Sequence, residues 1–346
     1  MDQATSTIIN MVEASYDLSV SEPAWLPHVM TVGLPLLDQG LGVGALEFSR
    51  PLNGEKVMIH QQYVASGPED FPERNMRFTS EGDAELSQAM TRPGMAMTLT
   101  ECAGDKYLDA VDRWRRYFDY SKDAFGVTAV DPDGQGIHII APLAEPTKLS
   151  ARTRQRWQMI GAHLAAGHRL HRSLREPSEA TSDLPHSAEL VLDAKNFRTT
   201  EAAGSGLNKS AQRALREAAV AVDTARGRLR KSSPEEALAI WRGLSRGRWS
   251  IVDWFDTDGR RYVLGLKNPP SIRDPRALTE RERQVATYAG FGESNKLIAY
   301  RLGLSESRVS KALQNAMHKL KTRNRAQLVA RMQESARLES NASSST

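Results

Sequence analysis

The sequence predicts an α+β chain of several domains: a larger and a smaller α+β domain, followed by an all-α domain of four short helices. Over the first 270 residues, strand-like runs bounded by Gly, Pro, Asn and Asp alternate with stretches of helical spacing. Residues 278–332 instead read as four consecutive short helices. A chain of 346 residues is also long enough for two or three domains that each bury a core.

Residues 1–176 are predicted to form the first domain. Asp131-Pro132-Asp133-Gly134 separates two strand-like runs and has the composition of a hairpin turn. Residues 95–100 are predicted as a central strand, and the polar stretch that holds Pro68 and Pro72 is assigned no element. The other predicted elements are helices over 8–16, 25–37, 83–91, 107–118 and 150–174, and strands over 43–48, 56–64, 125–130 and 136–141.

Residues 187–268 are predicted to form the second, smaller domain. Asp256-Thr257-Asp258-Gly259 is a strong hairpin signal between strands over 248–255 and 260–266. Ser233-Pro234-Glu235-Glu236 has the cap, the first-turn proline and the acids of a helix start. The remaining predicted elements are a hairpin of 190–192 with 197–200 and one long helix over 207–230.

Three stretches are predicted to connect or end these domains. Residues 176–186 are rich in Pro and Ser, and residues 268–276 hold three prolines, as expected of a stiff linker. The tail over 336–346 is Ser-rich and is predicted to be disordered.

Residues 276–335 are predicted to form the helical domain. Thr279 and Glu282 have the spacing of a capping box, and Ser294 caps the next helix. Gly303 supplies the left-handed conformation of a tight turn, after which a third helix runs over 305–320. Two helices joined by such a turn predict a helix-turn-helix, whose second helix lies in the DNA major groove.

This region resembles the LuxR-type (GerE-like) helix-turn-helix family. The resemblance rests on the following residues: Leu278, Thr279, Arg281, Glu282, Ser294, Asn295, Lys296, Ile298, Ala299, Leu304, Ser305, Val309, Lys319, Leu320 and Arg325. It implies that Ser310, Lys311 and Gln314 face base edges. It implies phosphate contacts or supporting roles for Ser294, Asn295, Lys296, Arg308 and Lys319. Arg308, Ser310 and Ala312 depart from the usual threonine, lysine and histidine, so the family's target sequence does not carry over.

The order of elements in the first domain resembles a GAF-like sensor, and that in the second a PAS-like domain with pieces missing. No sharp motif accompanies either resemblance. Together they imply that the region before the helix-turn-helix senses a small molecule or a partner.

Charge supports DNA binding by the C-terminal part. Residues 271–346 hold fourteen Lys and Arg against seven Asp and Glu, which gives +7; the chain carries +4, so the preceding 270 residues carry 4 − 7 = −3. A basic C-terminal part would neutralise phosphates and make the affinity salt-dependent. Cys102 is the single cysteine, so no intrachain disulfide and no cysteine zinc cluster is expected. No run of residues is as long and apolar as a spanning helix, and the N-terminus lacks a basic start followed by an apolar core. A cytoplasmic regulator of bacterial type fits these observations together.

The sequence lacks the motifs of the enzymatic and cofactor-binding classes. Gly40-Leu41-Gly42-Val43-Gly44 has neither the lysine nor the hydroxyl of a phosphate-binding loop. His60 and His138 lie on predicted strands without a second ligand at recognisable spacing, and Cys102 has no charged cluster nearby. Trp114, Tyr117 and Tyr120 are interpreted as core, and Asp253, Asp256 and Asp258 as hairpin residues. We therefore expect no enzyme activity, no cofactor and no metal.

Two helices have the spacing of a coiled-coil seam. The seam positions are Ala211, Leu215, Ala218, Val222, Ala225 and Leu229 in one helix, and Trp157, Ile160, Leu164, His171 and Leu174 in the other. Either helix could instead pack on its own sheet. Because helix-turn-helix proteins usually bind two half-sites, we expect a homodimer whose seam lies outside the DNA-binding domain.

The leading hypothesis is therefore a one-component transcription regulator that binds double-stranded DNA, with a small-molecule effector or RNA polymerase as further candidate partners. The alternative is an adaptor that binds proteins through residues 1–270 and uses DNA as an anchor. The sequence identifies neither the effector nor the operator, and it does not separate activation from repression.

Overall fold

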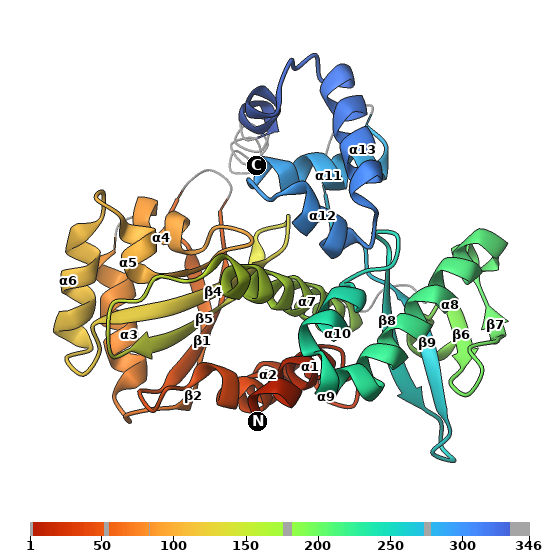
Figure 1. Cartoon of the computed structure of the whole chain (residues 1–346), viewed down its shortest axis with the longest axis horizontal. Helices are drawn as coiled ribbons and strands as arrows, with labels where there is room; N and C mark the ends of the chain where they lie inside the picture. The colour runs from red at the N-terminus through yellow and green to blue at the C-terminus, as the bar shows by residue number, and fades with distance from the viewer. Residues whose placement is uncertain (1–2, 52–54, 83, 176–181, 273–277, 333–346) are drawn as a thin grey trace. The chain divides into compact units, whose positions relative to one another are not determined.

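The computed structural model describes residues 3–51, 55–82, 84–175, 182–272 and 278–332. The chain divides into two compact units. Figure 1 shows the helices and strands of both units, coloured along the chain. Unit 1 comprises residues 1–33, 162–270 and 299–305, and unit 2 comprises residues 34–161, 271–298 and 306–346.

Unit 2 contains a five-stranded antiparallel sheet in the order β2-β1-β5-β4-β3. Its central strands are buried along their length, and β5 pairs Ile140 with Gly44 of β1 and His138 with Thr128 of β4. Gly134 has φ +85° and closes the β4–β5 turn, which confirms the predicted hairpin. The strands are β1 (Val43–Ser49), β2 (Met58–Ser66), β3 (Ala96–Thr98), β4 (Asp123–Val130) and β5 (Gln135–Leu143).

Helices of unit 2 pack on this sheet around a core of aromatic rings. Trp114 and Phe118 stack with centroids 3.9 Å apart, and Phe78 meets Trp114 edge-on at 5.3 Å. This confirms that Trp114 is a core residue, with Tyr117 and Tyr120 packed against the cluster. The helices are α3 (Phe71–Glu81), α4 (Ala84–Met90), α5 (Leu99–Ala103) and α6 (Leu108–Tyr117).

Two predictions for this unit were wrong. The stretch around Pro68 and Pro72, to which no element was assigned, contains the start of α3. Pro72 lies in the first turn of this helix, where its missing N–H removes no intrahelical hydrogen bond. Residues 95–100 do not form a central strand. β3 is a three-residue edge strand, because the Thr98 hydroxyl accepts from the Glu101 N–H and starts α5 in a capping box.

Unit 1 contains a four-stranded antiparallel sheet in the order β7-β6-β9-β8, which confirms both predicted hairpins. The Asp256 carboxylate accepts from the N–H groups of Asp258 and Arg260 at 3.0 and 2.8 Å, as hairpin chemistry requires. Asp253 instead pairs with Arg226 at 2.7 Å. The strands are β6 (Leu190–Asp193), β7 (Thr199–Ala202), β8 (Trp249–Phe255) and β9 (Arg261–Lys267).

The helix predicted over 207–230 is interrupted near its end. α8 spans Lys209–Thr224, a π-helical turn covers Ala225–Leu229, and α9 covers Arg230–Ser232. Gly227 has a non-helical ψ of −123°, which accounts for the break. Leu215 and Val222 of the proposed seam are buried, and Leu215 packs on Gly265 of β9. Leu215 of this seam therefore packs on the chain's own sheet, in line with the alternative that the sequence left open, whereas Ala218 and Leu229 are half-buried.

The other helices agree with the predicted ones. They are α1 (Gln3–Ser15), α2 (Glu22–Leu37), α7 (Ala151–Arg175) and α10 (Pro234–Ile240). In α7 the seam residues Trp157, Ile160, Leu164 and His171 are buried within the chain, and Leu174 is exposed. Most of the 176–186 segment, residues 273–276 of the 268–276 linker and the 336–346 tail lie outside the described residues.

Two buried histidines make unit 1 sensitive to acid. Burial lowers the pKa of His163 to about 3 and that of His171 to about 4, from 6.5. Below pH 6.5 these two histidines bind protons in the unfolded chain but stay neutral in the folded chain. Folding stability is therefore complete above pH 6.5 and decreases as the pH falls towards the folded-state pKa values.

We expect each of these histidines to remove up to about 1.4 kcal/mol of unfolding free energy per pH unit between pH 6 and 4.5. Urea unfolding at several pH values measures this slope. His163→Gln should reduce the slope of unfolding free energy against pH by the amount that corresponds to up to one bound proton. The control is His318→Gln, which removes an exposed imidazole and should leave the slope nearly unchanged. Equal slopes for the two variants would contradict a neutral buried His163.

Candidate nucleic-acid interface

The caps predicted at Thr279 and Ser294 are present, and the helix predicted over 305–320 spans 306–319. α11 spans Glu280–Gly290, α12 spans Asn295–Leu302 and α13 spans Glu306–Lys319, and residues 325–332 are helical. Helices α11 and α13 pack against each other in unit 2.

The capping box at the start of α11 is present. The Thr279 hydroxyl accepts from the Glu282 N–H at 3.3 Å, and the Glu282 carboxylate accepts from the Thr279 N–H at 2.8 Å. Lys319 at the end of α13 donates to the same carboxylate at 2.7 Å. Burial raises the pKa of Glu282, but these hydrogen bonds outweigh it and hold the pKa below its usual value. Glu282 thus ties the start of α11 to the end of α13.

Asn295 connects α12 to two other helices. Its amide nitrogen lies 3.3 Å from the Ser310 hydroxyl of α13, and its amide oxygen accepts from Arg325 at 2.7 Å. Arg325 also donates to the Glu293 carbonyl. Ser294 caps α12 by accepting from the Leu297 N–H at 3.2 Å. Asn295 and Ser294 therefore have structural partners in addition to any DNA contact.

The turn after α12 lies in unit 1 and is closely packed there. Gly303 has φ +61°, and a Cβ on it would lie 1.9 Å from the Leu244 carbonyl oxygen. Arg242 donates to the Leu304 carbonyl at 3.0 Å. Only glycine combines this backbone conformation with so close a neighbour. The prediction of Gly303 as the turn residue is confirmed.

Tyr300 anchors the end of α12 within unit 1. Its hydroxyl lies 2.7 Å from the His163 ring, and 2.7 and 2.9 Å from the Leu238 and Trp241 carbonyl oxygens. The other nitrogen of His163 lies 3.0 Å from the Tyr16 hydroxyl. Because these groups are buried, desolvation raises the pKa of Tyr300 well above its usual value and keeps the hydroxyl available as a donor.

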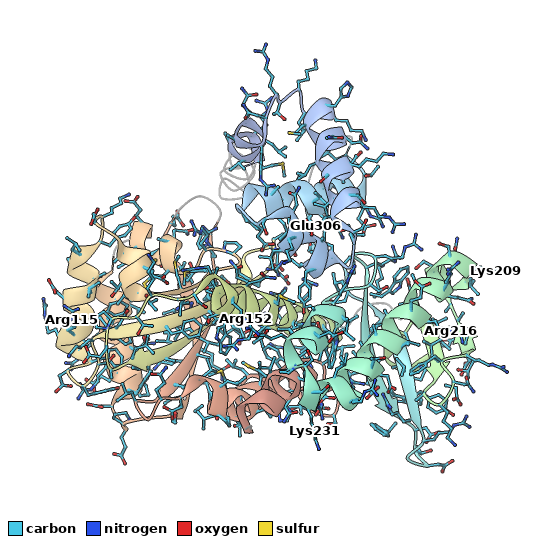
Figure 2. The ribbon with its side chains drawn as sticks, in the orientation of Figure 1. Arg115, Arg152, Lys209, Arg216, Lys231 and Glu306 are labelled. Carbon is cyan, nitrogen blue, oxygen red and sulfur yellow. The ribbon has the colours of Figure 1, made fainter. Side chains whose placement is uncertain are left out.

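α13 has one buried and one exposed face. Val309, Ala312, Leu313 and Ala316 are buried, so the departure from the family at Ala312 falls on the packed side. Figure 2 labels Glu306 at the start of α13 and draws the side chains that project from the rest of this helix. The exposed positions include Arg308, Lys311, Gln314, Asn315 and His318. A helix with such a polar face can enter the major groove of DNA.

The predicted site residues differ in their exposure and in their partners within the chain. Lys296, Arg308, Lys311 and Gln314 are exposed, whereas Ser310 is half-buried beside Asn295. Lys319 is held by Glu282. Sequence reasoning did not assign partners to Tyr300 or Arg325, because the partners of Tyr300 lie 59 to 137 residues away in the chain and those of Arg325 lie 30 to 32 residues away.

Comparison with known families identifies this region. Residues 276–332 match the family model described as bacterial regulatory proteins, luxR family. The matched span contains α11, α12, α13 and the helix over 325–332. No curated protein matches the chain. Residues 276–332 are therefore a LuxR-family helix-turn-helix domain.

Proposed function

We propose that this chain, whose residues 276–332 form a LuxR-family helix-turn-helix domain, is a non-enzymatic, sequence-specific transcription regulator that reads operator DNA with α13. The observation that carries the proposal is the exposed polar face of α13 on a helical scaffold of this family. Among the described residues no helix is long and apolar enough to span a membrane.

The residues of this surface have different proposed roles. Lys311 and Gln314 are exposed on α13 and would donate to base edges, where bidentate contacts distinguish sequences. Ser310 would contribute to the same surface. Lys296 and Arg308 would bind phosphates and fix the register, which carries no sequence information. Ser294, Asn295 and Lys319 would support them through the cap, the α12–α13 contact and the Glu282 ion pair.

Lys296→Ala tests the phosphate role. Loss of one phosphate contact should weaken specific and random duplexes alike and reduce the slope of log affinity against log salt by about one. Fluorescence anisotropy at several salt concentrations measures both quantities, and Lys209→Ala is the control for loss of one exposed lysine. An unchanged salt slope, or a loss confined to the specific duplex, would contradict this role.

The region before the DNA-binding domain would control DNA binding. Unit 2 contains a cavity of about 270 Å³ between its sheet and helices, which supports a GAF-like sensing role for it. The second sheet supports a PAS-like role for residues 187–268. The Tyr300 contacts within unit 1 are a route by which this region would bias the helix-turn-helix.

We also propose that the chain binds DNA as a homodimer, because helix-turn-helix proteins pair two half-sites one helical turn apart. A duplex that the full chain selects from random sequences provides the substrate for this test. Light scattering of the full chain with this selected duplex should give a complex of two chains per duplex. One chain per duplex at saturation would contradict the proposal. A duplex with a single half-site is the matched control and should hold one chain.

A further inference from the structure

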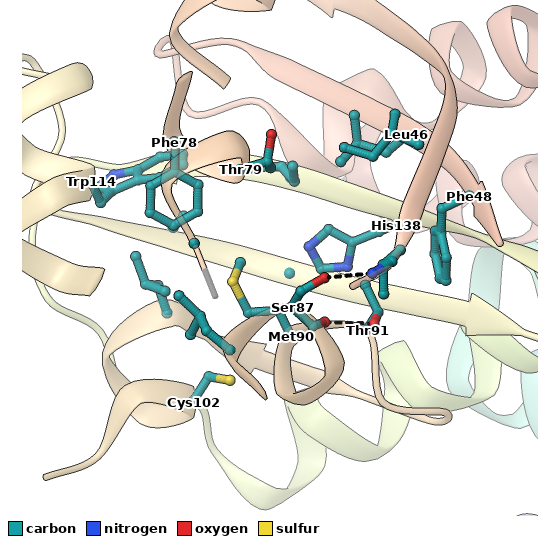
Figure 3. A pocket seen from close by; sticks show the side chains of 18 of the residues that line it. Leu46, Phe48, Phe78, Thr79, Ser87, Met90, Thr91, Cys102, Trp114 and His138 are labelled. Atoms are coloured by element: carbon teal, nitrogen blue, oxygen red, sulfur yellow. Dashed lines mark hydrogen bonds between the residues drawn. The ribbon is translucent and has the colours of Figure 1, made fainter. Parts of the chain in front are cut away.

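The cavity of unit 2 is lined mostly by apolar side chains from the sheet and from α3 to α6 (Figure 3). Leu46, Phe48 and Ile140 line it from the sheet, and Phe78 and Trp114 from the helices. Its volume of about 270 Å³ compares with the roughly 150 Å³ of an apolar cavity that holds benzene, so it has room for on the order of ten non-hydrogen atoms.

The imidazole of His138 projects from β5 into this cavity (Figure 3). It stands next to Gly126 on the neighbouring strand, where an added Cβ would lie 2.9 Å from the ring carbon Cε1 and 3.3 Å from Met95. The missing side chain at Gly126 therefore makes room for the ring in the cavity.

The hydrogen bonds behind His138 fix the position of its proton. The Thr128 hydroxyl lies 3.1 Å from the Met90 carbonyl, which can only accept, so the hydroxyl donates its single proton there. The same hydroxyl lies 2.8 Å from Nδ1 of His138 and must accept from it. We therefore assign the ring proton to Nδ1, which leaves Nε2 as a hydrogen-bond acceptor. Burial lowers the pKa of His138 to about 4, so the ring stays neutral at physiological pH.

Nε2 of His138 is an acceptor without a partner among the residues that the structure describes. Three hydroxyl groups of the lining already have hydrogen-bond partners. The hydroxyls of Thr79, Thr91 and Thr98 donate to backbone carbonyls. Of the described lining residues, Lys56 alone bears a formal charge, and it donates to the Ser80 carbonyl. Among the described lining residues no acidic side chain offers a counter-charge to a cation, and the Lys56 side chain is exposed to solvent.

We infer that this cavity binds a neutral, compact, largely apolar molecule of about ten non-hydrogen atoms that donates one N–H or O–H hydrogen bond to Nε2 of His138. The inference deepens the proposed function, because this molecule would be the effector of the regulator. A ligand without a donor would leave the buried Nε2 acceptor of His138 unpaired, which is costly, so the site selects for the donor as well as for shape.

Calorimetry with the full chain tests the inference with two probes of similar shape. Indole carries an N–H donor, and indene lacks it. We expect indole to bind with a Kd below about 1 mM, within the range that small ligands reach. His138→Phe keeps a ring but removes the acceptor, and it should weaken indole by about tenfold while changing indene less than threefold. His60→Phe makes the same replacement at an exposed position of the sheet and should alter neither.

A measurement without substitution covers the case in which His138→Phe does not fold. Nitrogen NMR of histidine-labelled protein should show His138 protonated on Nδ1, with the Nε2 resonance shifting on saturation with indole. A proton on Nε2 in the free protein, no binding of indole at millimolar concentration, or equal weakening of both probes by His138→Phe would overturn the inference.

Affinity for the selected duplex, measured with and without indole, separates this inference from the proposed function. Tight indole binding that leaves DNA affinity unchanged would support the ligand site and overturn its role as effector site. DNA binding without any indole binding would overturn the ligand site and leave the DNA-binding function in place.

Discussion

Gly303→Ala should lower the free energy of unfolding by about 3 to 5 kcal/mol. About 1 to 2 kcal/mol of this comes from placing a Cβ in the left-handed region at φ +61°. The rest comes from overpacking, because that Cβ would lie 1.9 Å from the backbone oxygen of Leu244. A carbonyl of the main chain cannot rotate aside as a side chain can, so the turn or its neighbour must shift.

Gly292→Ala is the matched control. Gly292 has φ +85°, and a Cβ added there would meet nothing within 4 Å, so this variant carries the backbone strain without the clash. Urea unfolding of both variants should show Gly303→Ala less stable by about 2 kcal/mol or more. Equal losses would mean that the turn does not pack on the segment around Leu244.

Replacing both Lys311 and Gln314 by alanine should remove most sequence discrimination. Each base contact contributes about 1 to 3 kcal/mol, so the double variant should bind the selected duplex about 30-fold to 10⁴-fold more weakly. Both side chains are exposed on α13, so their loss should not affect folding. Anisotropy with selected and random duplexes measures the effect, with thermal unfolding as the check on folding.

The random duplex provides the internal comparison for this double variant. The affinity of the double variant for the random duplex should fall only by the small electrostatic contribution of Lys311, and this difference should decrease as salt increases. Asn315→Ala on the same exposed face is the matched control for truncation of α13 outside the proposed base contacts. Equal losses on both duplexes would assign Lys311 and Gln314 to the DNA backbone.

Features of the fold that rest on neighbouring residues could be predicted from the sequence. The capping box of Thr279 and Glu282 and the turn at Gly303 are fixed by residues close in the chain, and both are present. Pro72 misled the prediction because a proline disrupts a helix interior but suits its first turn. Gly227 likewise broke a helix whose apolar spacing continues on both sides of it.

Features that rest on distant partners could not be predicted. The ion pair of Glu282 with Lys319 spans 37 residues, and the contact of Tyr300 with His163 spans 137. Sequence reasoning placed His138 on a strand and weighed it as a metal ligand. Its role in the cavity depends on the register of β4 and β5, which brings Thr128 opposite it. The distant parts of this arrangement are the Met90 carbonyl, 38 residues from Thr128, and the helices that close the cavity.

Selection of a duplex by the full chain, followed by titration against a scrambled duplex of equal length, tests most directly whether α13 reads DNA. We predict that the selected duplex binds at least about 10³-fold more tightly than the scrambled one, with both affinities falling steeply as salt increases. Equal affinity for the two duplexes, or no binding at low ionic strength, would contradict the account.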